Sequence, residues 1–181
     1  LKNMRPDLQL DSIRGNIDSR IRKLETEGFD AVVLAAAGLT RMGWQDRISA
    51  YIPVDLSIPA VGQGALGIEC RSEDAEVREL LDLFNDTETS LAVRAERSFL
   101  GALNGGCQIP IGAFAVVRKK TEDSFDHAEL ELTGMVGSPD GEVMLKEIRK
   151  GTDPEQLGRD VAAALAARGA DRILAEIGDH L

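Results

Sequence analysis

The sequence predicts an α/β chain in two parts. A strand–helix–strand unit with parallel strands comes first, and a small α+β domain with a three-stranded sheet and helices follows. Two observations carry this prediction. The apolar run at 31–36 is typical of a parallel strand buried on both faces, and it follows an amphipathic helix pattern. Beyond residue 110, three strand-like segments come in succession with helical patterns on either side, which indicates an α+β domain.

The first part contains one βαβ unit. Residues 8–13 form a short strand candidate, and Asn16 is a plausible N-cap for the helix that follows. Apolar residues recur at Ile17, Ile21 and Leu24, and this helix ends near Gly28. The second strand is predicted at 31–36, and short helical turns are predicted at 39–51.

Pro53 and Pro59 bracket an extended segment that marks a boundary. Together with the α+β pattern of the last part, this predicts three units, at 1–58, 59–85 and 86–181. After this boundary we expect a strand through Cys70, a helix at 73–84, and a longer helix that is capped by Asn85 and Glu88 and ends at 104–106. Strands follow at 111–118, 127–136 and 142–148, with a turn at 138–141, and the last elements are helices at 154–168 and 170–178.

Composition narrows the class of protein. Of the 181 residues, 43% are hydrophobic and 29% are charged, which is typical of a soluble globular protein. The longest apolar run, 31–39, has nine residues, so no membrane segment is expected. The chain begins with neither a signal-peptide pattern nor Met, and we expect a piece of a longer protein.

The charge is unevenly distributed. The net charge is −10, which disfavours binding to nucleic acid. Residues 1–58 carry eight basic and eight acidic side chains, whereas the remainder carries 13 and 23. The early basic residues include arginines at 14, 20, 22, 41 and 47, which would hold a small anion if several converged.

Two cysteines are too few for a disulfide scaffold, and no Cys/His cluster suggests a metal. We expect reduced thiols in a cytosolic protein. Cys70 is expected in the core. Cys107 follows Gly105 and Gly106 in an open loop, where it is either an ordinary loop cysteine or a reactive thiol, since reactivity depends on a pKa that sequence does not show.

Three arginines are candidates for a carboxylate site. Arg14 precedes Gly15 and Asn16 at a helix start, where free N–H groups and the helix dipole favour an anion. Arg20 lies beside the apolar stripe of that helix, and Arg41 follows the small residues 35–38. The alternatives are solvated arginines and plain tight packing of the small residues.

The string Gly62-x-Gly64-x-x-Gly67 matches a dinucleotide fingerprint, but Pro59 precedes it and a strand-like segment follows. A crossing between domains, in which glycines adopt unusual dihedral angles, is the better interpretation.

Four strings, in order along nearly the whole chain, closely resemble the porphobilinogen deaminase family, also called hydroxymethylbilane synthases. They are Arg14-Gly15-Asn16 with Arg20, 34–39 with Arg41, 59–65 with Gln63, and 105–112 with Cys107. The resemblance implies a three-domain protein whose first two domains are similar to periplasmic-binding-protein lobes. This chain would begin within the second lobe and contain the whole third domain.

The resemblance also implies the chemistry. In the family one cysteine, at the position of Cys107, holds a dipyrromethane cofactor by a thioether bond. Four porphobilinogen molecules lose ammonia and add head-to-tail, and water releases hydroxymethylbilane. Arg14, Arg20 and Arg41 match positions that bind the carboxylates of the growing linear tetrapyrrole, and Asn16 and Gln63 lie in matching loops.

The family's catalytic aspartate lies in domain 1, so we expect no catalytic residue in this chain, no metal, and no activity of the chain alone. We expect a cytoplasmic enzyme, a transferase of haem biosynthesis, whose full-length form is monomeric. The alternatives are a non-catalytic small-anion-binding lobe with an inert Cys107, and a nucleotide-dependent oxidoreductase that rests on the glycine string alone.

Overall fold

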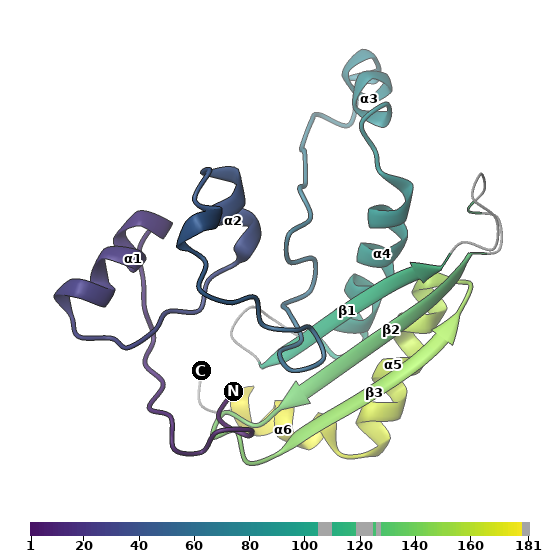
Figure 1. Cartoon of the computed structure of the whole chain (residues 1–181). Helices are drawn as coiled ribbons and strands as arrows, with labels where there is room; N and C mark the ends of the chain where they lie inside the picture. The colour runs from purple at the N-terminus through teal and green to yellow at the C-terminus, as the bar shows by residue number, and fades with distance from the viewer. Residues whose placement is uncertain (105–109, 119–124, 126–127, 179–181) are drawn as a thin grey trace.

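A three-stranded antiparallel sheet organises the C-terminal half of the chain in the computed structural model (Figure 1). The structure describes residues 1–104, 110–118, 125 and 128–178. The strands are β1 (Ile111–Arg118), β2 (Glu129–Gly137) and β3 (Met144–Gly151), in the order β1-β2-β3. All three predicted strands are confirmed to within three residues, except that His127 lies outside the described residues.

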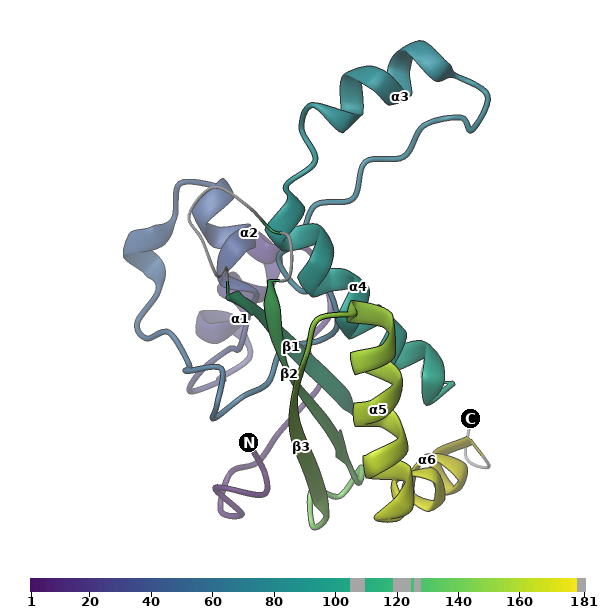
Figure 2. The same ribbon diagram turned by 90° about the vertical axis from the view of Figure 1, so that its right-hand side faces the viewer.

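Two helices cover one face of this sheet, α4 (Thr87–Ala102) and α5 (Pro154–Ala167), and α6 (Ala170–Gly178) follows α5 (Figure 2). They enclose the hydrophobic core between themselves and the inner side chains of the strands. Fully buried side chains come from both layers: Phe99, Leu130, Leu132, Val136, Val161 and Leu165. The predicted small α+β domain is therefore present.

Side chains cap the two covering helices as the sequence indicates, with one correction. Asp153 accepts a hydrogen bond from the Gln156 backbone N–H at 2.7 Å and caps α5. The N-cap of α4 is Asp86, not Asn85, because the Asp86 carboxylate accepts from the Thr89 N–H at 2.7 Å. After α4 the positive φ, 51°, falls on Asn104.

The first part of the chain forms α1 (Ile17–Thr26), α2 (Ala36–Arg41) and a short 3₁₀ helix at Gln45–Arg47. Figure 2 shows α1 and α2 on the opposite side of the sheet from α4 and α5. The predicted strands at 8–13 and 31–36 are wrong: neither segment pairs in a ladder, and α2 already begins at Ala36. A strand needs hydrogen-bonded neighbours, and no described segment lies beside these two as a partner strand.

An arm projects from the body and carries α3 (Ala75–Asp82), which confirms the helix predicted at 73–84 (Figure 1). The strand predicted through Cys70 does not form, and Cys70 is exposed, not in the core. Little of the described chain packs against the arm, so its apolar side chains also face solvent: Leu83 is 80% exposed and Phe84 78%.

Candidate functional site

Gly15 and Asn16 build the start of α1. Gly15 has a φ of +123°, and a Cβ there would lie 2.9 Å from Ser19 Oγ, so the position requires glycine. Asn16 Oδ1 accepts a hydrogen bond from the Ser19 backbone N–H at 2.8 Å, which confirms Asn16 as the N-cap. The remaining N–H groups at this end favour an anion.

The three candidate arginines differ in their surroundings. Arg20 is half-buried, and its Nε donates to the Gly15 carbonyl at 2.7 Å, so its side chain folds back over the helix start. Arg14 and Arg41 are exposed, and neither forms an ion pair with another described residue. Other arginines do pair with carboxylates of this chain, including Arg5, Arg22, Arg71, Arg94, Arg149 and Arg168.

The small residues 35–38 bring α2 against α1, and the two helices lie side by side in Figures 1 and 2. A Cβ at Gly38 would lie 2.6 Å from Ile17 Cδ1, the far end of a flexible side chain, so a larger residue at this position would displace Ile17. The run therefore serves helix–helix packing. Gly38 therefore lets α2, which ends at Arg41, approach Ile17 in the first turn of α1.

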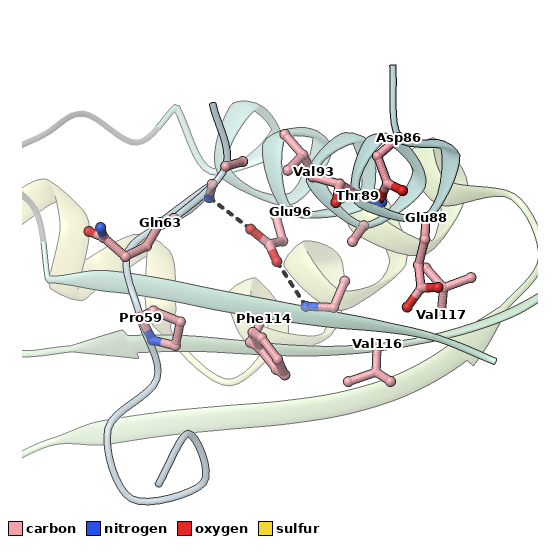
Figure 3. A pocket seen from close by; sticks show the side chains of 15 residues that line it. Pro59, Gln63, Asp86, Glu88, Thr89, Val93, Glu96, Phe114, Val116 and Val117 are labelled. Carbon is pink, nitrogen blue, oxygen red and sulfur yellow. Dashed lines mark hydrogen bonds between the residues drawn. The ribbon is translucent and has the colours of Figure 1, made fainter. Parts of the chain in front are cut away.

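The Gly62–Ala65 turn lies in sequence between the two parts of the chain, and Figure 3 shows its residue Gln63 beside the pocket. Gly62 and Gly64 have φ values of +69° and +92°, which confirms that these glycines adopt unusual dihedral angles. No helix begins at this string, since α3 starts only at Ala75, so the dinucleotide interpretation lacks the helix N-terminus that it requires. Gln63, at the tip of the turn, is exposed and lines a cavity of about 420 Å³ between the turn, α4 and β1.

The same cavity contains a buried carboxylate that sequence reasoning missed. Glu96 on α4 is 6% exposed, and its two oxygens accept hydrogen bonds from the backbone N–H groups of Gly62, at 2.8 Å, and Ala115, at 2.9 Å (Figure 3). Burial raises the pKa of the Glu96 carboxyl, and the two hydrogen bonds offset only part of that rise. The other carboxyl groups lining the cavity are Asp86 and Glu88.

A signal for Glu96 was present in the sequence. Ala92, Glu96 and Phe99 are spaced i, i+4, i+7, so the glutamate lies on the buried face of the predicted helix. A charged residue at such a position requires hydrogen-bonding partners inside the protein.

The structure brings some of the predicted residues together and leaves others apart. Arg14, Asn16 and Arg20 share the start of α1, whereas Gln63 lies in a cavity that none of the three arginines lines. Cys107 lies outside the described residues. Within the described part, no group of three or more His, Cys, Asp or Glu side chains could hold a metal ion, and no helix has the length and apolar character to cross a membrane.

Fold and site together define a two-part protein in which an arginine-bearing helical segment joins a small α+β domain through a glycine turn. Two family models match this chain in order. Residues 1–79 match "Porphobilinogen deaminase, dipyromethane cofactor binding domain", and residues 90–167 match "Porphobilinogen deaminase, C-terminal domain".

Curated relatives agree with the family models. The chain is 56% identical over 173 residues to a porphobilinogen deaminase of Brevibacillus brevis, covering 96% of this chain and 54% of that protein. It is 53% identical over 180 residues to one of Geobacillus kaustophilus, covering 97% and 56%. The chain belongs to the porphobilinogen deaminase family, and it spans about half the length of the curated relatives it matches.

Proposed function

We propose that this chain is the C-terminal part of a hydroxymethylbilane synthase, a transferase that condenses four porphobilinogen molecules head-to-tail, with loss of ammonia, and releases hydroxymethylbilane. The observation that carries the proposal is the identity of 56% over 96% of the chain to a protein named porphobilinogen deaminase. Both family models, which together cover most of the chain, support it.

Two separate stretches would share the dipyrromethane cofactor. The model whose description names cofactor binding covers residues 1–79, whereas Cys107 falls in the stretch that matches the C-terminal domain. Residues 1–79 would grip the cofactor, and the Cys107 thiolate would hold it by a thioether bond. When bound, the dipyrromethane supplies the free pyrrole carbon from which the tetrapyrrole grows.

The residues of the first part fit an acidic ligand of this kind. Each pyrrole carries acetate and propionate, and charge-assisted hydrogen bonds from guanidinium groups hold carboxylates well. Arg14 and Arg41 are exposed and form no ion pair with the described residues, so their charges remain available for a ligand. Arg20, the start of α1 capped by Asn16, and the amide of Gln63 would complete the contacts.

The domain organisation belongs to the same proposal. Residues 1–58 would be the last part of a periplasmic-binding-protein-like lobe, 59–85 the crossing that returns to domain 1, and 86–181 the third domain. The exposed apolar side chain of Val33, 59% accessible in a segment with no partner strand, supports a lobe completed by earlier residues. The catalytic aspartate would lie in domain 1, and the full-length enzyme would be cytoplasmic and monomeric.

The experiment that tests the proposal is the intact mass of the full-length protein and of two serine variants. Cys107→Ser is expected to lose the covalent cofactor mass, because a hydroxyl is a far poorer nucleophile than a thiolate. Cys70→Ser is the matched control, since Cys70 is exposed on the arm, and it is expected to retain the adduct. Loss of the adduct in Cys70→Ser alone, or a wild-type protein without any adduct, would refute the assignment.

A further inference from the structure

Among the described residues, Glu96 is the charged residue that is buried, and its side chain connects three elements. It belongs to α4, and its carboxylate oxygens accept hydrogen bonds from Gly62 in the crossing turn and Ala115 in β1. These partners lie 34 and 19 residues away in sequence. Because both donors are backbone N–H groups, a change of their side chains does not remove the contacts.

The crossing segment is fastened at a second place, just before the turn. The Ala113 N–H of β1 donates to the Pro59 carbonyl at 3.0 Å, and a Cβ at Gly112 would lie 3.0 Å from the carbonyl oxygens of Ile58 and Pro59. Pro59 is therefore held to the strand and Gly62 to the helix, and Gln63 is the next residue. Besides the Glu96 bond, the described contacts that attach this segment to the domain are those of Pro59 and of Val61, which packs against the hydrophobic core, and both precede the turn.

The chemistry of the site requires glutamate. A carboxylate offers acceptors to both N–H groups at once, whereas glutamine offers one oxygen and directs an NH₂ group at the other donor. Aspartate has the right charge, but its side chain is one methylene shorter. A buried N–H group that loses its acceptor destabilises the local arrangement. Because Ala115 is held in the β1–β2 ladder and Gly62 lies in a turn, the substitution should release Gly62.

We propose that Glu96 is a positioning residue, which fixes the turn carrying Gln63 against α4 and β1. Its importance for the reaction rests on the proposed function, in which Gln63 contacts the cofactor or the growing tetrapyrrole. Glu96 then acts through Gln63 and does not itself touch the ligand.

Amide hydrogen exchange in the full-length protein tests the attachment without reference to activity. In the wild type, the Gly62 amide should exchange at least tenfold more slowly than that of Ala65, whose N–H bonds the Gly62 carbonyl within the exposed turn. In Glu96→Gln the Gly62 amide should exchange about tenfold faster than in the wild type, with the Leu132 amide of β2 unchanged. The control Glu155→Gln removes a surface carboxylate of α5 and should leave Gly62 unchanged.

Equal exchange rates at Gly62 and Ala65 in the wild type would overturn the proposal, and this result does not depend on whether Glu96→Gln folds. Uniform acceleration across the sheet in Glu96→Gln would also overturn it, since that would show only a general loss of stability.

A double-mutant cycle on kcat/KM for porphobilinogen tests the link to Gln63. Glu96→Gln should lower kcat/KM about tenfold in the wild-type background and hardly at all in a Gln63→Ala background. Independent, multiplicative losses would overturn the positioning role, and so would full activity of Gln63→Ala. A wild-type full-length protein that forms no hydroxymethylbilane would refute the proposed function instead, and the exchange data would still decide the attachment.

Discussion

A single added methyl group should separate the two helices that cover the sheet. Gly158 lies in α5 where it crosses α4, and a Cβ there would be 2.6 Å from the Ala95 carbonyl oxygen, the Phe99 nitrogen and Ser98 Cβ. Two of these three atoms are backbone, so no side chain can rotate away to make room. Gly158→Ala therefore forces the helices apart over Phe99, which is fully buried.

The expected magnitude follows from two opposing effects. Overpacking of a core by one methyl group costs about 1–3 kcal/mol, and the backbone contacts at Gly158 place it at the upper end. Alanine gains about 1 kcal/mol over glycine in helix propensity. The net result is a free energy of unfolding lower by about 2 kcal/mol. A matched control is Gly101→Ala in α4, where an added Cβ meets no atom within 4 Å. It should raise the free energy of unfolding by up to about 1 kcal/mol.

Urea unfolding of the 181-residue chain, followed by circular dichroism, measures both variants. The midpoint should fall for Gly158→Ala and rise for Gly101→Ala, each with an unchanged m-value. A Gly158→Ala protein as stable as the wild type would refute the reasoning, because it would show that α4 and α5 are not in close contact at this point.

Three further outcomes are expected. In the full-length enzyme, Arg14→Leu or Arg20→Leu should each reduce turnover of porphobilinogen by roughly 10–150-fold, the equivalent of about 1.5–3 kcal/mol for a charge-assisted bond. The control Arg159→Leu on α5 should leave turnover unchanged. Equal losses in all three variants would indicate general destabilisation. Because burial raises the folded-state pKa of Glu96, the native state binds the proton more tightly than the unfolded state does. The unfolding free energy of the wild type minus that of Glu96→Gln should therefore fall as the pH rises from the ordinary carboxyl pKa of 4.5 through the raised one. A rise of this difference would contradict the burial argument. The 181-residue chain alone should release no ammonia from porphobilinogen, and sustained turnover would show that a catalytic carboxylate lies within it.

Local patterns predicted the small α+β domain well because its elements satisfy one another within the chain. The strands predicted at 111–118 and 142–148 correspond to β1 and β3, which pair with β2 between them, and Asp153 with Pro154 starts α5 as expected. Among the predicted site residues, Asn16 caps a helix as the sequence indicated. Gly62, next to the predicted site residue Gln63, takes an unusual dihedral angle, as expected.

The errors arose where an element depends on a partner that a local pattern does not contain. The apolar composition of 31–36 indicates burial, yet Val33 is 59% exposed because no strand pairs with this segment. The same limit explains Cys70, whose apolar neighbours suggested a core that the arm does not have. Glu96 was missed for a different reason: its role depends on Gly62 and Ala115, and no local pattern indicates that their N–H groups converge on it.

The order of elements has a consequence for synthesis on the ribosome. The helix α4 precedes the whole sheet and α5 follows it, yet they pack against each other, and a Cβ at Gly134 of β2 would touch both Phe99 and Val161. As the chain emerges from its N-terminus, α4 and the three strands are complete while one side of their core is still open to water. The domain can close over Phe99 only after α5 has emerged, so the nascent chain exposes an apolar sheet face until α5 has been made.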